Sequence, residues 1–335
     1  MMILITGGAG YIGTHLVLGL LRDGYSIVVF DNLSNSTINN LRRMADAKVA
    51  KGRFAFVKGD VRDRTAVKRV FNRFEITKVI HLAGLKSINE SILNAELYHE
   101  VNVEGSRNVF EVALEHDVFT IVFSSTAAAY KQTDSGIYSE TDVLDGSTSP
   151  YSQTKIDAEN ILHELKKKDI TVDMVILRYF NPVGTDSSIP LYEENATLSN
   201  LFPTIVQNII DHTYFPIYGN DYDTKDGTAV RDYIHVSDLV AAHRLMIGGY
   251  ALYTTVRVFN VGSGTGYTVR EVVETFNREY IHPVLFTYSG RRAGDTAISI
   301  ADTTKIRNSF NWKPIRTLTD MVRSVLSKTD LNKRK

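Results

Sequence analysis

Tyr151 and Lys155 are the two residues of this chain whose types and spacing most directly suggest chemistry. Ser149 can cap a helix and Pro150 suits its first position, so the spacing predicts both side chains on one helical face. A free tyrosine has a pKa near about 10 and is a poor base at neutral pH. A neighbouring ammonium favours the phenolate and lowers that pKa, so the pair predicts a tyrosine that accepts a hydroxyl proton.

A glycine-rich run, Thr-Gly-Gly-Ala-Gly-Tyr-Ile-Gly over Thr6–Gly13, supports this interpretation, because Tyr-x-x-x-Lys alone also occurs on plain helix surfaces. Glycines in a strand-to-helix turn let backbone N–H groups approach a dinucleotide pyrophosphate. Asp31 follows Gly13 by 18 residues at a strand end, where an acid accepts ribose hydroxyls and repels a 2′-phosphate. The sequence therefore predicts NAD rather than NADP. Asp60 either reaches the adenine or is an ordinary turn aspartate.

A third reactive group is expected at the end of the run Ile-Val-Phe-Ser-Ser-Thr. We expect Thr126 to bridge the substrate oxygen and Tyr151, with Ser124 and Ser125 bonded to backbone instead. Together these features predict an enzyme that moves a hydride on and off a hydroxyl-bearing carbon.

The first half of the chain alternates short apolar runs with amphipathic stretches, which predicts an α/β fold with a doubly wound parallel (Rossmann) sheet. A helix is expected over Gly10–Leu21 with Gly24 as its C-cap. The alternation becomes irregular after about Asn181. We therefore expect a Rossmann domain over residues 1–180 and a smaller mixed α/β lobe over residues 181–335. Some segments of the lobe are expected to return to the first domain. The predicted strands are Met2–Ile5, Ser26–Phe30, Phe54–Val57, Val79–Leu82, Thr120–Phe123 and Val256–Val261. Thr268–Glu271 reads as a capping box that opens a later helix.

The amino-acid composition excludes several classes of protein. The 335 residues are 43% hydrophobic, with zero formal net charge and no cysteine. This predicts a globular protein without disulfides, thiolate metal sites, or broad attraction to nucleic acid or anionic membrane. No 18-residue apolar run and no basic leader are present, so a cytoplasmic location is expected. The nine histidines show no metal-ligand spacing, and no metal is predicted.

Further motifs resemble the UDP-galactose 4-epimerase family of the extended short-chain dehydrogenase/reductase superfamily. The similarity runs from residue 2 to about residue 316. The motifs begin at Asp31 (Asp-Asn-Leu-Ser-Asn-Ser), His81 (His-Leu-Ala-Gly-Leu-Lys), Arg178 (Arg-Tyr-Phe-Asn-Pro-Val-Gly), Tyr218 (Tyr-Gly-Asn-Asp-Tyr), Asp226 (Asp-Gly-Thr-Ala-Val-Arg-Asp-Tyr-Ile-His-Val) and Arg291 (Arg-Arg-Ala-Gly-Asp).

This resemblance implies bound NAD, a UDP-sugar substrate and a homodimer. Tyr151 would be the base, assisted by Lys155 and Thr126. The NAD site would comprise Gly7, Gly10, Tyr11, Ile12, Gly13, Asp31, Asn32, Asn35, Ser36, Asp60, Val61, Leu82, Ala83, Gly84, Lys86, Asn102, Tyr151, Lys155 and Tyr179. The substrate site would comprise Lys86, Thr126, Tyr151, Phe180, Asn181, Asn200, Leu201, Tyr218, Arg231, Arg292, Asp295 and Ser299.

The implied reaction inverts the C4 carbon of a UDP-hexose through a transient 4-keto sugar, with NAD regenerated in each cycle. Arg231 and Arg292 suit a diphosphate, since a planar guanidinium pairs with two oxygens, although a single arginine more often serves a salt bridge or a solvated surface. Asp295 can accept from ribose hydroxyls, and Tyr218 can stack on uracil. Apolar residues recur at helical spacing over Ser91–His116 and Lys155–Lys166, namely Val109, Val112, Ile156 and Ile161. Such stripes form either a dimer interface or an intradomain core, so the sequence alone does not decide whether the chain dimerises.

The stretch Thr126–Lys131 departs from the family pattern. The family usually has serine at the first position and glycine at the last, so turnover is expected to be slow or the substrate altered. Related nucleotide-sugar 4,6-dehydratases have threonine followed by two acids, but this chain has Ala127 and Ala128, which makes dehydration improbable.

Ser299 falls where some family members have a bulky tyrosine and others a small residue. A small residue leaves room for a 2-acetamido group, so our hypothesis is that UDP-N-acetylhexosamines are also substrates; the alternative is an unrelated loop serine. Two further functions remain open, a 4-epimerase of UDP-pentoses or uronic acids and a catalytically weak nucleotide-sugar-binding paralogue.

Overall fold

The computed structural model of the chain describes residues 2–46, 49–50, 52–186, 188, 200–249, 253–292 and 294–327. The chain divides into two compact units, and each is built from three segments. The first comprises Met1–Lys131, Val143–Tyr179 and Val240–Phe259, and the second comprises Gln132–Asp142, Phe180–Leu239 and Asn260–Lys335. Residues 132–142 thus group with the second unit, although they precede residue 180 in the sequence.

A seven-stranded sheet forms the centre of the first unit, in the order β11-β7-β5-β4-β1-β2-β3. The six strands from β7 to β3 pair in parallel. Their order and direction confirm the predicted doubly wound sheet. The strands are β1 Met2–Thr6, β2 Ser26–Asp31, β3 Phe54–Lys58, β4 Ile76–His81, β5 Thr120–Thr126, β7 Asp173–Tyr179 and β11 Arg257–Val261.

Several predicted strand bounds are corrected. β4 begins at Ile76 and ends at His81, whereas Val79–Leu82 was predicted. β5 continues to Thr126, beyond the predicted end at Phe123. The polar residues Ser124–Thr126 belong to β5 because its backbone still pairs with β7 there, so strand pairing extends past the apolar run from which the strand was predicted.

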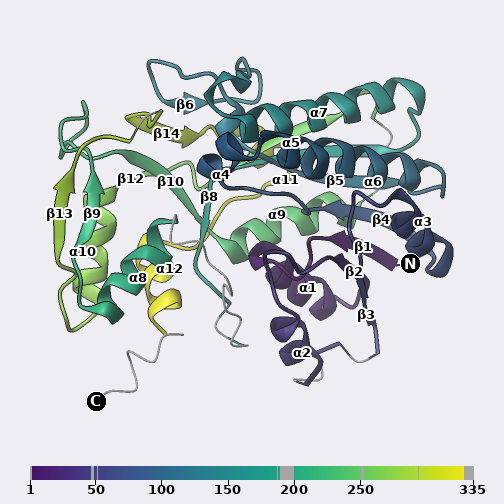
Figure 1. Cartoon of the computed structure of the whole chain (residues 1–335), viewed down its shortest axis with the longest axis horizontal. Coiled ribbons are helices and arrows are strands. Elements are labelled where there is room, and N and C mark those ends of the chain that lie inside the picture. The colour runs from purple at the N-terminus through teal and green to yellow at the C-terminus, as the bar shows by residue number, and fades with distance from the viewer. Residues whose placement is uncertain are drawn as a thin grey trace. The chain divides into compact units, whose positions relative to one another are not determined.

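Helices cover both faces of this sheet. Figure 1 shows α6 and α7 on one side of the strands and α1 and α9 on the other. The helices are α1 Tyr11–Arg22, α2 Asn39–Asp46, α3 Arg64–Arg73, α4 Ile88–Leu93, α5 Ala95–His99, α6 Gly105–Leu114, α7 Pro150–Lys168 and α9 Val236–Gly248, with a π-helical segment Glu100–Glu104 between α5 and α6.

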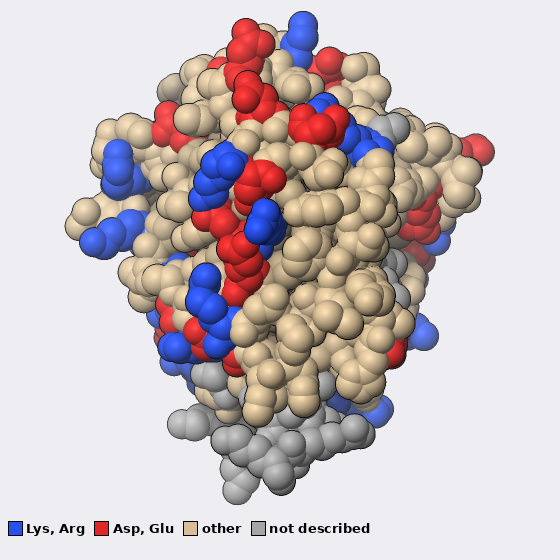
Figure 2. Space-filling model, turned by 90° about the vertical axis from the view of Figure 1, so that its left-hand side faces the viewer, with Lys and Arg blue, Asp and Glu red and all other residues tan. Residues whose placement is uncertain are grey.

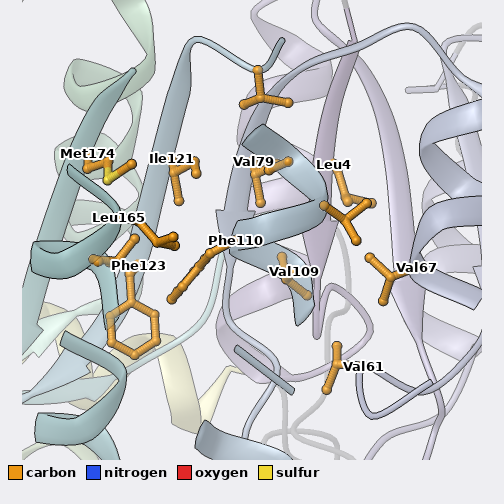
Figure 3. Packing of buried hydrophobic residues seen from close by; sticks show 14 of the residues in the cluster. Leu4, Val61, Val67, Val79, Val109, Phe110, Ile121, Phe123, Leu165 and Met174 are labelled. Carbon is orange, nitrogen blue, oxygen red and sulfur yellow. The ribbon is translucent and has the colours of Figure 1, made fainter. Parts of the chain in front are cut away.

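The hydrophobic core between the sheet and the helices α3, α6 and α7 is continuous. Figure 3 shows Phe110 of α6 and Leu165 of α7 beside Ile121 and Phe123 of β5. Val109, Val112 and Ile161, which were candidates for a dimer interface, belong to this core. For these three residues the intradomain-core interpretation is therefore correct, whereas Ile156, the fourth candidate, is half-buried and is not part of this core.

Local signals explain where the key helices begin and end. The Ser149 side chain caps α7 by accepting from the Ser152 backbone N–H at 3.1 Å, and Pro150 is the first helical residue, as predicted. α1 begins one residue later than predicted, with Gly10 as its N-cap. Its C-cap is Asp23 rather than Gly24, but Gly24 follows with a φ of +92°, the left-handed conformation that glycine adopts at little cost after a helix.

The described residues of the second unit form two smaller sheets and the helices α8, α10, α11 and α12. One sheet has the order β12-β10-β14-β6 with β8 also paired to β10, and the other pairs β9 with β13. The strands are β6 Ile137–Tyr138, β8 Asn181–Val183, β9 Phe215–Tyr218, β10 Val230–His235, β12 Gly266–Thr268, β13 Phe286–Ser289 and β14 Ile298–Ala301. The helices are α8 Leu201–Asp211, α10 Val269–Glu279, α11 Thr304–Phe310 and α12 Leu318–Leu326. The predicted capping box is present, since Thr268 and Glu271 exchange bonds at the start of α10.

Surface charge is mixed. Figure 2 shows acidic and basic side chains interspersed on the face drawn there, without a broad area of one sign, beside a wide area that lacks charged side chains. None of the helices in the described ranges combines the length and the apolar character that a membrane span requires.

Candidate active site

The three predicted catalytic side chains lie together in the first unit. Thr126 is the last residue of β5, and Tyr151 and Lys155 occupy the first two turns of α7. The Thr126 hydroxyl lies close enough to the Tyr151 phenol to act on it, in the direction that lowers its pKa. Lys155 is buried, with Nζ donating to the Ser124 carbonyl at 2.8 Å and lying 4.8 Å from the centroid of the Phe123 ring. A tyrosine, a hydroxyl and an ammonium therefore meet where β5 ends against α7.

Burial shifts the proton affinities of both members of the pair. It lowers the pKa of Lys155 to about 8, because a buried ammonium loses hydration, and the Glu159 carboxylate opposes this effect. Burial raises the pKa of Tyr151, and the hydrogen bond with Thr126 acts in the opposite direction. The net effect of the protein on Tyr151 is thus opposite to the predicted lowering. The reason is that burial of the phenol, which disfavours the charged phenolate, outweighs the opposite effect of Thr126.

A chain of buried hydrogen bonds extends from β1 to α6 behind these residues. Thr6 Oγ1 lies 2.6 Å from His81 Nδ1, and His81 Nε2 lies 2.9 Å from Ser106 Oγ. The Ser106 hydroxyl donates to the Asn102 carbonyl at 2.5 Å. Both nitrogens of the His81 ring are thus engaged, and burial together with the Lys155 ammonium lowers the pKa of His81 to about 3. His81 is neutral at physiological pH.

Asn102 extends this chain to the catalytic helix. Its Nδ2 donates to Thr154 Oγ1 at 3.1 Å and to the Leu85 carbonyl at 3.0 Å, while its Oδ1 accepts from the Leu85 N–H at 2.8 Å. Thr154 in turn donates to the Tyr151 carbonyl at 2.8 Å. Asn102 was predicted to line the NAD site, and its amide makes positioning contacts that the sequence did not predict. It lies in the π-helical segment, an irregularity often found at functional sites.

The glycine loop is shaped as a dinucleotide site requires. Gly7 has a φ of +69° after β1, and a Cβ on Gly13 would lie 2.4 Å from the Gly7 carbonyl oxygen. A Cβ on Gly7 would lie 2.6 Å from the Ala83 nitrogen. The first and last glycines therefore permit close packing of the turn against α1 and against the segment after β4. Gly10 ends the turn as the N-cap of α1.

Asp31 lies at the end of β2, next to this loop. Its carboxylate accepts from the Ala9 N–H at 3.0 Å, the Leu33 N–H at 2.8 Å and the Ser36 hydroxyl at 3.3 Å. A carboxylate has about four acceptor positions, so capacity for a further hydroxyl remains. Ser36, predicted as a cofactor residue, thus contacts Asp31 directly.

Asp60 is held by two side chains, those of Arg62 and Asn32. Arg62 donates to it from Nε at 3.1 Å and from Nη2 at 2.9 Å, and Asn32 Nδ2 donates at 2.9 Å. The hydrogen bond from Arg62 is the main cause that lowers the pKa of Asp60 to about 2. These contacts match the turn-aspartate interpretation, and a contact with adenine stays a prediction.

The remaining predicted cofactor residues lie in the same unit. Tyr179 ends β7 directly opposite Thr126, and its hydroxyl lies 2.5 Å from Nε2 of the buried His243, which the sequence did not single out. Burial raises the pKa of Tyr179. Val61 is buried in the core, Asn35 and Lys86 are exposed, Leu82, Ala83 and Gly84 follow β4, and Tyr11 and Ile12 begin α1.

The residues predicted to bind UDP lie in the second unit, and contacts link four of them, Tyr218, Arg231, Arg292 and Asp295; the Asp295 N–H donates to the Arg292 carbonyl at 3.2 Å. Arg231 of β10 pairs with Ser299 of β14 in the sheet, and its Nη2 lies 3.4 Å from Asp295 Oδ1. The Arg292 guanidinium carbon lies 3.8 Å from the centroid of the Tyr218 ring. This group combines two guanidinium groups with an aromatic ring, which suits a nucleoside diphosphate.

The other four predicted substrate residues are placed by backbone contacts. The Phe180 N–H donates to the Val261 carbonyl at 3.1 Å, and Asn181 Nδ2 donates to the Asp232 carbonyl at 2.8 Å. Asn200 is the N-cap of α8 and Leu201 its first residue. Within the described ranges no group of three or more His, Cys, Asp or Glu side chains is arranged to hold a metal ion.

The sequence did not assign roles to Thr6, His81, Ser106 and Thr154. A signal was present for two of them: Thr6 and His81 are polar residues that end the apolar strands β1 and β4. A polar residue at such a position needs a buried partner, which predicts a hydrogen-bond network at that edge of the sheet. The partners themselves lie far along the chain and were not predictable from spacing.

Comparison with known proteins gives consistent matches over the whole chain. Residues 4–325 match the sequence model of the family described as GDP-mannose 4,6 dehydratase. The chain is 40% identical over 323 residues to a UDP-glucose 4-epimerase of Bacillus subtilis (strain 168), covering 96% of this chain and 94% of that one.

Comparison with solved structures gives the same family as the sequence comparison. The crystal structure of UDP-glucose 4-epimerase from Bifidobacterium longum in complex with NAD+ and UDP superposes with a TM-score of 0.91 at 36% identity, covering 99% of each chain. The UDP-Glc/GlcNAc 4-epimerase of Campylobacter jejuni superposes with a TM-score of 0.83 at 32% identity, covering 100% of this chain and 99% of that one.

The neutral, buried state of His81 predicts a specific pH dependence of stability. In the unfolded chain a histidine titrates near about 6.5, whereas His81 in the folded chain titrates near about 3. Between these values the unfolded state binds the extra proton, so the free energy of unfolding falls as the pH is lowered through this window. Urea unfolding between pH about 6.5 and about 5 should show a fall for the wild type that exceeds the fall for His81→Asn by about 1 kcal/mol per pH unit. Parallel pH dependences of the two proteins would contradict the assignment.

Proposed function

The chain belongs to the UDP-glucose 4-epimerase family, and from this premise we propose that it inverts the C4 hydroxyl of a UDP-hexose with NAD as its cofactor. The observation that supports this most directly is the arrangement of Thr126, Tyr151 and Lys155 at the end of β5. Binding alone needs neither the buried ammonium nor the phenol hydrogen-bonded to a hydroxyl, so these residues favour an enzyme over a nucleotide-sugar sensor.

The first unit has the features that NAD requires. Gly7 and Gly13 allow the turn to pack without side chains, and the N-terminus of α1 follows directly. Asp31 retains acceptor capacity for one ribose hydroxyl. We propose that these residues, with the other cofactor residues named above, hold NAD, which supplies the acceptor and donor of the hydride.

Each catalytic residue has a defined task in this proposal. Tyr151, as the phenolate, accepts the proton of the C4 hydroxyl while the C–H hydride leaves, giving a 4-keto sugar. Lys155 stabilises the phenolate through its positive charge, and Thr126 donates a hydrogen bond to the same oxygen. The hydride then returns to C4 on the opposite face of the sugar and Tyr151 returns the proton to the C4 oxygen, so the reaction has no net redox change.

The second unit would hold the nucleotide. Arg231 and Arg292 suit the diphosphate, Tyr218 the uracil and Asp295 the ribose. Firm contacts to UDP with few contacts to the sugar permit the 4-keto sugar to rotate in the pocket, so that its opposite face is presented before it is reduced. Phe180, Asn181, Asn200 and Leu201 complete the proposed set.

Dehydration, the activity named by the matching family model, is not favoured by the residues of this chain. The 3-10 helix Ala127–Ala129 follows Thr126 directly, and its alanines provide no carboxylate to eliminate water. UDP-pentoses and UDP-uronic acids remain alternative substrates of the same chemistry, which a panel of UDP-sugars assayed without added NAD distinguishes.

We also propose a homodimer formed through α4 and α5. Large apolar side chains are exposed there, with Ile92 at 63% and Leu93 at 82% of their full accessibility, and Ile88 and Leu97 beside them in sequence. Contiguous exposed apolar surface often marks an interface. A cytoplasmic location is part of the proposal and agrees with the absence of cysteine.

Substitution of Tyr151 tests the proposed reaction. Tyr151→Phe removes the hydroxyl that accepts the proton, so turnover of UDP-galactose should fall by about two to four orders of magnitude, the range typical of general acid–base catalysis. UDP affinity should be nearly unchanged. Equal turnover of the variant and the wild type would exclude Tyr151 as the base.

Ser299 provides a test of substrate range. Because a small residue leaves space for a 2-acetamido group, the wild type should convert UDP-GlcNAc as well as UDP-glucose, in keeping with the substrates named for the C. jejuni relative. Ser299→Tyr should lose UDP-GlcNAc turnover by about tenfold or more while it retains UDP-glucose turnover. If the wild type converts UDP-glucose well and UDP-GlcNAc not at all, the broader range is excluded.

The dimer can be tested with a charge in the exposed apolar surface. Leu93→Asp should shift the protein from dimer to monomer in sedimentation velocity at micromolar concentration, because a carboxylate is costly to bury in an interface. Ile170→Asp is the matched control, since Ile170 is exposed at 59% and lies beyond the end of α7. A monomeric wild type, or a dimeric Leu93→Asp variant, would contradict this interface.

A further inference from the structure

A buried ion pair lies one helical turn below Lys155. Glu159 of α7 and Arg178 of β7 have side chains exposed by only 2% and 5%. Arg178 donates from Nη2 to Glu159 Oε2 at 2.6 Å and from Nε to Oε1 at 3.0 Å, a bidentate geometry. Burying two charges is costly, and replacing such a pair by apolar residues often leaves stability unchanged. Stability alone therefore does not explain why this buried ion pair is present.

Two further side chains complete the cluster. The Ser125 hydroxyl donates to Glu159 Oε1 at 2.5 Å. Arg178 donates from Nη1 to the Tyr130 hydroxyl at 3.1 Å, and its guanidinium carbon lies 5.0 Å from the centroid of the Tyr130 ring. Glu159 thus accepts three hydrogen bonds and joins α7 to the ends of β5 and β7.

Two members of the cluster, Ser125 and Arg178, are adjacent in sequence to residues of the proposed active site. Ser125 precedes Thr126, and Arg178 precedes Tyr179. In the sheet Ser125 is paired with Arg178 and Thr126 with Tyr179, so the cluster forms the layer immediately before the reactive one. Glu159 follows Lys155 by four residues, which places both on one face of α7.

The charges around Lys155 make Glu159 its main counter-charge. Glu159 raises the pKa of Lys155 against the lowering by burial. The other titratable groups that face this region are Tyr151 on α7, His81 on β4, which is neutral, and Arg178 on β7, which lies behind the carboxylate. Glu159 is the acid that favours the ammonium form of Lys155.

We propose that Glu159 is a positioning residue for the reaction: its carboxylate, fixed by Arg178 and Ser125, holds the ends of β5 and β7 against α7 and keeps the Lys155 side chain charged beside Tyr151. Glu159 does not touch the reacting atoms and acts through Lys155 and through the strand end that carries Thr126. This inference rests on the proposed epimerase function.

The experiment compares four proteins with their NAD content intact. They are the wild type, Glu159→Gln, the double variant Glu159→Gln/Arg178→Gln, and Glu164→Gln. Glu164 is an exposed carboxylate on the same helix, so its substitution is a matched control. The double variant leaves no unpaired buried charge and therefore covers the case in which Glu159→Gln alone does not fold. Turnover and KM for UDP-galactose are measured across pH, together with bound NAD and the thermal midpoint.

Loss of the Glu159 charge should move the alkaline limb of the turnover profile toward lower pH by about one unit, because Lys155 loses its proton more readily. For a group that titrates near about 8, this shift corresponds to an about fivefold loss of turnover at that pH. KM for UDP-galactose and the NAD content should match those of Glu164→Gln, since the proposed nucleotide residues lie in the other unit. The double variant should shift in the same direction.

A Glu159→Gln protein, or the double variant, that is less stable but keeps the wild-type pH profile would overturn the positioning role. Absence of turnover in both the wild type and Glu164→Gln would overturn the proposed function, and this inference with it. Active controls with an unshifted Glu159→Gln profile would overturn this inference alone.

Discussion

The burial of one lysine ammonium is the constraint on which the site depends. Lys155 is only 6% exposed, so its charge loses most of its hydration. The protein replaces the lost water with the Ser124 carbonyl, the face of the Phe123 ring and the charge of Glu159. The groups that replace the water come from β5 and α7. The end of β5 and the helix α7 must therefore keep their relative positions for Lys155 to stay protonated. A cation buried at this depth requires a rigid frame.

The parallel sheet provides that frame because it brings residues distant in sequence to one edge. Thr6, His81 and Thr126 end three different strands; Thr6 meets His81, while His81 and Thr126 each meet a polar partner from a helix. The hydrogen bonds from Thr6 through His81 and Ser106 to Asn102 connect the strand before the glycine loop to the helix of Tyr151. The cofactor loop and the catalytic helix are therefore parts of one polar network rather than separate modules.

Local signals in the sequence predicted several elements of this structure correctly. Ser149 and Pro150 predicted the start of α7, Thr268 predicted the capping box, and alternation of apolar runs predicted the parallel sheet. Features that depend on contacts between residues distant in the sequence were not predicted. The partners of Asp60, the His243 beside Tyr179 and the ion pair of Glu159 lie on elements that spacing does not connect. The direction of the Tyr151 pKa also required knowing how deeply the phenol is buried.

The threonine at position 126 shows how a departure from the family pattern can preserve the chemistry. Its Oγ1 accepts from the Ala128 N–H at 3.1 Å, which caps the 3-10 helix that follows. With that acceptor position occupied, the hydroxyl proton is left to donate to the Tyr151 oxygen, the direction that stabilises a phenolate. The methyl group restricts rotation about χ1 and so favours this one orientation. Ala128 needs no side-chain hydroxyl for the arrangement, since it contributes its backbone N–H.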